Sequence, residues 1–125
     1  MNKGFTLIEV ISVIVIISIL LIFTIPSVIE SIEEARERKY NEIISNIEQT
    51  TQLYIRNNKD SIEGIDVLNN TIQITIEDLV INEGLKTPII NPINDNEISQ
   101  DTTINIVVKP RYKYEVTVGE IIYVE

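Results

Sequence analysis

The chain has 125 residues, enough for one domain, and carries 10 Lys and Arg against 19 Asp and Glu, a formal net charge of −9. This acidic balance argues against direct binding to the phosphate backbones of nucleic acids. The sequence contains neither Cys nor His, which excludes disulfides, thiol nucleophiles, Ser-His triads and nearly every zinc site. An enzyme would have to use carboxylates, Lys, Tyr or Ser alone, so we expect a protein that is not an enzyme and has no cofactor.

An apolar segment extends from residue 5 to residue 25. At about 1.5 Å per residue, a helix of this length matches a hydrocarbon core about 30 Å thick. An ordinary secretory signal would have a cleavage site after the apolar segment, but none is present near Pro26. The small residue suited to cleavage, Gly4, precedes the segment and follows Lys3, the basic residue of a very short leader. Glu9 is the only charged residue between Phe5 and Val28, and a bare charge there would be costly, so Glu9 requires a partner.

The stretch Gly4-Phe5-Thr6-Leu7-Ile8-Glu9-Val10 with the apolar helix that follows resembles the prepilin signal of type IV pilins and of type II secretion and competence pseudopilins. The resemblance implies that a membrane-embedded prepilin peptidase cuts between Gly4 and Phe5 and methylates the new amino group of Phe5. The helix then remains on the mature protein, first as a membrane anchor and later in the core of a filament. In such filaments the carboxylate at the position of Glu9 lies near the amino end of a neighbouring subunit, which implies a role in subunit assembly.

The same resemblance implies the partners and the location. The direct partners are the prepilin peptidase, other pilin or pseudopilin subunits and the bilayer, whereas an assembly platform protein and an ATPase act indirectly. The amino terminus is expected in the cytoplasm and the head outside, on the cell surface after assembly. A count of positive charges opposes this orientation, because Arg36, Arg38 and Lys39 follow the span and only Lys3 precedes it. The alternative is a signal-anchored single-pass membrane protein that does not polymerise.

Residues 28–57 are expected to form an amphipathic helix. Its apolar residues recur at three- and four-residue steps along one stripe, in which Arg36 and Thr51 fill the gaps. The stripe consists of Ile29, Ile32, Tyr40, Ile43, Ile47 and Tyr54. The opposite face has the spacing of solvated ion pairs, Glu33 with Arg36 and Glu34 with Arg38. Pro26 separates this helix from the span, and its missing N–H predicts a kink.

Residues 58–125 are expected to form a small head. Thr75 and Gly84 have the character of an N-cap and a C-terminal stop around a helix over residues 76–83. Alternating side chains predict strands over residues 104–109, 112–118 and 121–124, arranged as a three-stranded antiparallel meander. Two-residue turns at Pro110-Arg111 and Gly119-Glu120 would join them, the second of type II′. The amphipathic helix is expected to cover this sheet.

These predictions combine into an α+β, pilin-like fold in which a long N-terminal helix packs on a small antiparallel sheet. Residues 1–4 would be the leader, 5–27 the transmembrane and filament-core helix, 28–57 the amphipathic helix and 58–125 the loop and β head. An oxygen-rich stretch over residues 91–101 lacks the EF-hand spacing and its glycine, so we expect a solvated turn there and predict no metal ligand.

Overall fold

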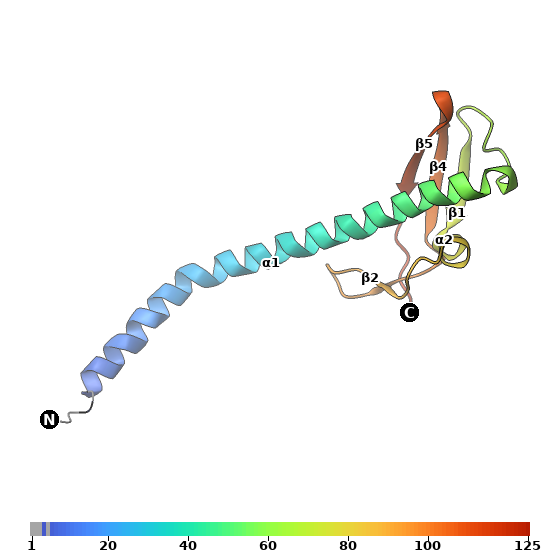
Figure 1. The fold of residues 1–125 in the computed structure, drawn as a ribbon. Coiled ribbons are helices and arrows are strands. Elements are labelled where there is room, and N and C mark those ends of the chain that lie inside the picture. The colour runs from blue at the N-terminus through green and yellow to red at the C-terminus, as the bar shows by residue number, and fades with distance from the viewer. Residues whose placement is uncertain (1–3, 5) are drawn as a thin grey trace. The chain divides into compact units, whose positions relative to one another are not determined.

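The computed structural model describes residue 4 and residues 6–125. The chain divides into two compact units, residues 1–36 and residues 37–125. Helix α1, Leu7–Asn58, contributes its first part to one unit and its last part to the other (Figure 1). It is the one helix in the described part of the chain that is long and apolar enough to cross a membrane.

In the first unit, α1 carries an apolar surface that nothing within this unit covers. The large apolar side chains from Leu7 to Ile32 are all exposed. Three hydroxyl groups of the apolar segment are satisfied within the helix, because each donates to the carbonyl four residues earlier, at 2.7 Å for Ser12, 2.8 Å for Ser18 and 2.7 Å for Thr24. Internal satisfaction of polar groups is what a bilayer requires of a spanning segment. The helix continues through Pro26, and the kink there stays a prediction.

The second unit is built on a three-stranded antiparallel sheet. Its strands are β1 (Thr71–Thr75), β4 (Thr103–Lys109) and β5 (Lys113–Val118), in the order β1-β4-β5. Ile104 and Ile106 of the central strand are buried on one side of the sheet and are matched across it by apolar partners. Ile104 pairs with Ile74 and Val118, whereas Ile106 pairs with Ile72 and Val116. These matched side chains form the part of the hydrophobic core that the sheet contributes.

The predicted third strand is wrong, although the two strands before it are confirmed. In a meander, residues 121–124 would lie beside β5, but the third strand of this sheet is β1, on the other side of β4. Residues 121–124 instead join a second, two-stranded sheet of β2 (Ile89–Ile90) and β3 (Glu97–Ile98). There Tyr123 bridges Ile98, and the Val124 N–H donates to the Glu97 carbonyl at 2.9 Å. The final segment therefore satisfies its backbone on another sheet edge.

Both predicted turns of the meander also differ from the structure. The β4–β5 connection is a three-residue 3-10 turn, Pro110–Tyr112, in which Arg111 and Tyr112 have φ of 67° and 57°. Gly119 lacks the positive φ that a type II′ turn needs. It serves close approach instead, because a Cβ at this position would lie 2.8 Å from Thr103 Oγ1 and 3.1 Å from the Thr103 carbonyl oxygen. The chain thus continues past β5 without folding back on it.

The predicted short helix is confirmed as α2, Ile76–Glu83. Its capping box joins Thr75 and Asp78, with the Thr75 N–H donating to Asp78 Oδ2 at 2.9 Å. Gly84 ends the helix with a left-handed φ of 66°, a conformation that glycine adopts without steric cost. These local signals determined the helix because both of its ends depend on residues adjacent in sequence.

The last part of α1 covers the sheet, which confirms the expected α+β, pilin-like fold. Ile47, Thr51 and Ile55 are buried, and the Gln52 Nε2 donates to the Tyr114 carbonyl of the edge strand at 2.8 Å. Ile55 was not in the predicted stripe. The core consists of Ile47, Ile55, Ile65, Ile74, Ile76, Leu79, Ile89, Ile98, Ile104, Ile106 and Val108, with Ile43 and Tyr54 packed against it. Burial raises the pKa of the Tyr54 hydroxyl, and the carboxylates of Asp78 and Glu83 raise it further.

Candidate functional site at the start of helix α1

The start of α1 is closed by a reciprocal pair of hydrogen bonds between Thr6 and Glu9. The Thr6 N–H donates to Glu9 Oε2 at 3.2 Å, and the Glu9 N–H donates to Thr6 Oγ1 at 3.3 Å. This arrangement is a capping box, in which the first and fourth residues of a Thr-x-x-Glu sequence satisfy each other's backbone groups. The sequence displays this Thr-x-x-Glu pattern, but only Glu9 was predicted to be functional, and the role of Thr6 is evident from the structure.

The capping box places the Glu9 carboxylate where the backbone and side chain of the same subunit stabilise its negative charge. The Thr6 carbonyl accepts hydrogen bonds from the N–H groups of Glu9 at 3.1 Å and Val10 at 3.2 Å, so α1 begins here. The carboxylate lies in the first helical turn, where the positive end of the helix dipole favours a negative charge by about 0.3–1 kcal/mol. A side-chain cap contributes about 1 kcal/mol more. Helix initiation and the charge of Glu9 therefore support each other.

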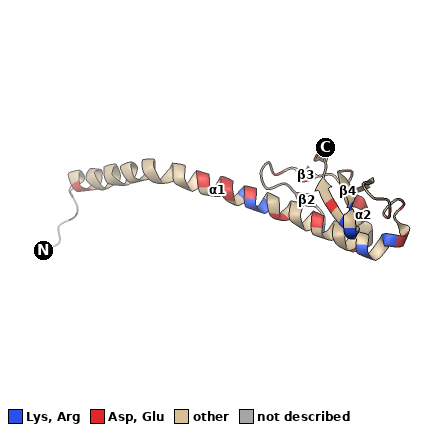
Figure 2. Ribbon diagram, turned by 90° about the horizontal axis from the view of Figure 1, so that it is seen from above, with Lys and Arg blue, Asp and Glu red and all other residues tan. Residues whose placement is uncertain are grey.

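The surroundings of Glu9 are apolar and uncovered within this unit. Leu7 is 77% exposed and Ile8 is 74% exposed. In Figure 2 a short acidic segment at the start of α1 precedes a long stretch without charge. A carboxylate held at the end of a helix, and not in its middle, remains reachable by a cation from another molecule. The arrangement suits an exchange of hydrogen-bond partners, and Glu9 is the one titratable side chain among the described residues of this first turn.

The other predicted site residues are only partly described by the structure. Gly4 is exposed and precedes α1, and a Cβ built on it would meet nothing within 4 Å. Lys3 and Phe5 lie outside the described residues, so cleavage between Gly4 and Phe5 and methylation of Phe5 stay predictions. Pro26 lies within α1.

In the head, asparagine side chains of the oxygen-rich loop over residues 91–101 accept hydrogen bonds from backbone N–H groups of the same loop. Asn91 Oδ1 accepts from the Ile93 N–H at 2.9 Å, and Asn94 Oδ1 accepts from the Asn96 N–H at 3.0 Å. The Asn91 amide also donates to the Tyr123 hydroxyl at 2.9 Å. No group of three acidic side chains in the described ranges is placed to hold a metal ion. The asparagines therefore order the loop and tie it to the final segment.

Residues 1–25 match the family model of the prokaryotic N-terminal methylation motif. This motif is the prepilin-type cleavage and methylation signal of type IV pilins and pseudopilins. No curated protein and no solved structure matches the chain. The motif, which covers the first 25 residues, supports a type IV pilin-like substrate of a prepilin peptidase and points to a structural protein rather than an enzyme. Together with the apolar α1, it is consistent with anchoring in a membrane.

Proposed function

We propose that this chain is a structural subunit of a type IV pilus-like filament or of a type II secretion pseudopilus. Residues 1–4 are a leader that the prepilin peptidase removes between Gly4 and Phe5, and the new amino group of Phe5 is methylated. Residues 5–27 anchor the chain and later enter the filament core, residues 28–57 form the amphipathic helix and residues 58–125 form the head. The observation that supports this most strongly is that the methylation motif coincides with the uncovered apolar first part of α1, in which the one carboxylate before Val28, that of Glu9, is held in a capping box.

The exposed apolar surface of α1 is the physical reason for assembly. Apolar side chains in water cost roughly 25 cal/mol for each Å² exposed, so this helix requires a non-aqueous neighbourhood at every stage. A bilayer supplies it before assembly, and the packed helices of other subunits supply it afterwards. Transfer between these two environments exchanges one apolar contact for another and leaves the head folded.

Glu9 provides the polar part of that transfer. Cleavage would leave Phe5 with a cationic amine that methylation keeps basic. At about 4 Å and an effective dielectric constant of about 20, this amine and a carboxylate attract each other by about 4 kcal/mol before the desolvation cost is subtracted. The Glu9 carboxylate, capped by Thr6 within one subunit, would then pair with the amine of the next subunit. Because the pair forms only at one axial offset, Glu9 sets the register of the helices.

The direct partners in this proposal are the prepilin peptidase, other subunits of the filament and the bilayer, with a platform protein and an ATPase acting indirectly. The amino terminus lies in the cytoplasm and the head lies outside the membrane. Assembly then carries the head to the cell surface.

The test is to express a tagged chain in its native host, shear the cells, and compare sheared and membrane fractions. We expect the tag in high-molecular-mass filaments, and mass spectrometry of their amino terminus should show N-methylated Phe5. A mature chain that still begins at Met1 and never leaves the membrane fraction would instead identify a signal-anchored single-pass protein that does not polymerise.

A further inference from the structure

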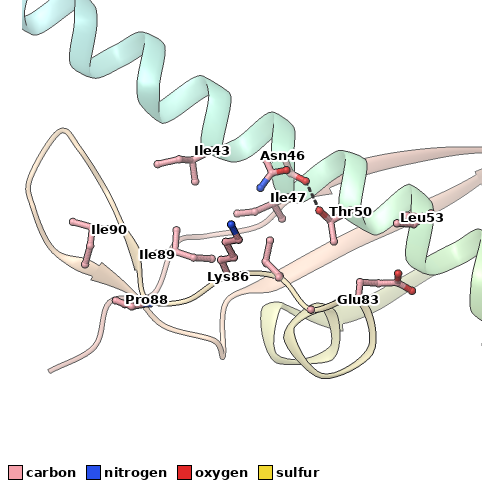
Figure 3. A pocket seen from close by; sticks show the side chains of 12 residues that line it. Ile43, Asn46, Ile47, Thr50, Leu53, Glu83, Lys86, Pro88, Ile89 and Ile90 are labelled. Carbon is pink, nitrogen blue, oxygen red and sulfur yellow. Dashed lines mark hydrogen bonds between the residues drawn. The ribbon is translucent and has the colours of Figure 1, made fainter.

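An open apolar groove lies within residues 37–125, between α1 and the segment that follows α2 (Figure 3). Its volume is ≈ 550 Å³, within the range of about 300–1,000 Å³ that is usual for binding pockets. Ile43 and Leu53 border it on the helix side, whereas Leu85, Ile89 and Ile90 border it on the other. Leu53 is 44% exposed and Ile90 is 42% exposed. The groove therefore presents apolar side chains that the head itself leaves partly uncovered.

The polar groups in the groove indicate what it can accept. Figure 3 shows the Lys86 side chain directed between the two walls. Lys86 forms no ion pair in the described part of the chain, where Lys109 with Glu115 is the one pair, at 3.3 Å. Two other polar side chains of the lining already have partners, because the Glu83 carboxylate accepts from Asn57 Nδ2 at 3.2 Å and the Thr50 hydroxyl donates to the Asn46 carbonyl at 2.7 Å. An occupant with an apolar ridge and a carboxylate beside it would satisfy both the walls and the Lys86 amine.

Such a ridge exists on α1 within the first unit. Ile25, Ile29 and Ile32 follow the i, i+4, i+7 spacing by which an amphipathic helix enters an apolar groove. Their exposed fractions are 51%, 51% and 49%. Glu33 follows this ridge and is not in an ion pair among the described residues, because its predicted pair with Arg36 does not form within 4.0 Å. The three isoleucines would supply apolar contacts for the walls of the groove, and Glu33 would supply a carboxylate for the Lys86 amine.

We propose that the groove of one subunit receives the Ile25/Ile29/Ile32 face of α1 from a second copy of the chain, with Lys86 beside Glu33 of that copy. The inference rests on the proposed filament function and names the contact that joins head and helix in it. The two surfaces differ, so the interface is heterologous. Heterologous contacts repeat head to tail and generate an open helical filament unless the rotation closes. One groove and one ridge on every subunit therefore suffice for continued growth.

Cysteine cross-linking can test the contact, because the chain has no cysteine of its own. Two differently tagged full-length copies would be expressed in the native host, one with Ile29→Cys and the other with Leu53→Cys. Mild oxidation of the sheared filaments should give a dimer that carries both tags. The matched control replaces Leu53→Cys by Ile81→Cys, because Ile81 is 71% exposed but lies on α2 and does not line the groove. The control should lose the dimer.

Charge reversal provides a second, independent measurement. Lys86→Glu should reduce the amount of sheared filament, and adding Glu33→Lys to the same chain should restore it. Lys113→Glu, an exposed reversal on β5 outside the groove, should leave the amount unchanged. A loss that Glu33→Lys does not restore would contradict the assigned partner of Lys86.

The outcomes separate this inference from the function on which it rests. Filaments that form normally but give no Ile29–Leu53 dimer, or equal dimer with Ile81, would overturn the groove contact and leave the filament function intact. The groove would then hold another occupant, such as a different pilin-like subunit or a small amphiphile. If no filament forms from the unmodified chain, both proposals fail.

Discussion

At the scale of single residues, Glu9 is the group whose environment changes most in the proposed function. In the isolated chain its carboxylate accepts the Thr6 N–H at 3.2 Å, so the charge is held at the helix end. This local partner reduces the cost of carrying the charge in an apolar segment. A cationic amine from another subunit would be a stronger partner, because an ion pair in apolar surroundings is screened little by salt. The capping box therefore stabilises the Glu9 carboxylate in the isolated subunit, and the stronger ion pair with a neighbouring subunit can still replace it.

Replacing Glu9 tests this residue directly. Glu9→Val should still insert into the membrane and be cleaved, because the span becomes more apolar, but the amount of filament should fall sharply. Glu9→Asp should keep part of the assembly, since the charge remains on a shorter arm. Immunoblots of sheared and membrane fractions would measure both variants, with Ser18→Ala as an exposed control in the same helix. Normal filament from Glu9→Val would show that the carboxylate is only a tolerated charge.

Gly119 is a second residue whose role the structure makes testable. Gly119→Ala should destabilise the head by about 1–3 kcal/mol, the usual cost of forcing an extra group into a packed site, because the new Cβ would lie 3.1 Å from the Thr103 carbonyl oxygen. Urea unfolding of residues 28–125 would measure the change, and the exposed neighbour Glu120→Ala is the control. Equal stability of the two variants would mean that the backbone yields easily there.

At the scale of elements, the head depends on α1 more than on its own strands. The sheet has three strands, and a sheet of that size requires cover on its apolar side to be stable in water. Ile47, Thr51 and Ile55 of α1 are almost wholly buried in that position. The Asn57 Nδ2 also donates to Glu83 Oε2 of α2 at 3.2 Å. The end of α1 is thus a structural part of the head, and not a stalk attached to it.

Two fragments would test this dependence. Residues 28–125 should form a soluble, folded protein, because they lack the apolar span but retain the buried face of α1. Residues 60–125 should not fold, since their sheet would lose its cover and a chain of about 65 residues has little stability to spare. Circular dichroism during heating would distinguish a cooperative transition from a gradual one. A cooperative transition in the shorter fragment would show that the sheet is stable without α1.

At the scale of the whole molecule, the chain combines an apolar segment at the start of α1, in which Glu9 is the one charge before Val28, with an acidic head. The charges of opposite sign do not balance, and the net charge is −9. Copies of the chain should therefore repel one another weakly through their heads, whereas the apolar part of α1 drives them together. Association in the proposed filament depends on that helix being present on the mature protein, and hence on where the leader is cut.

The cleavage position can be tested on the full chain. Gly4→Leu should block processing. A peptidase pocket that accepts Gly at this position is expected to be narrow, and the bulky Leu side chain would not fit it. The precursor should then accumulate in membranes with an intact Met1, and filaments should be absent. Mass spectrometry of the intact protein would show the mass of the retained leader. Asn2→Ala, a change within the leader away from the cut, is the control. Processing of Gly4→Leu at Phe5 would contradict the predicted site.

The sequence by itself determined the features that depend on neighbouring residues. These include the apolar helix, the methylation motif, the capped and terminated α2, and the alternation of β4 and β5. Thr6 and Glu9 could also have been recognised as a capping box, because the signal spans four residues. In each case the controlling interaction is local, so the order of residues is sufficient to specify it.

Only the tertiary structure decided which segment completes the sheet and which surfaces stay uncovered. Residues 121–124 pair with β3 instead of β5, and β1 pairs with the side of β4 that faces away from β5, because strand pairing joins segments distant in sequence and depends on all other contacts. The close approach of Gly119 to Thr103, the burial of Ile55 and the groove beside Lys86 arise in the same way. Each is a product of packing between parts of the chain that are far apart in sequence, and no local pattern encodes it.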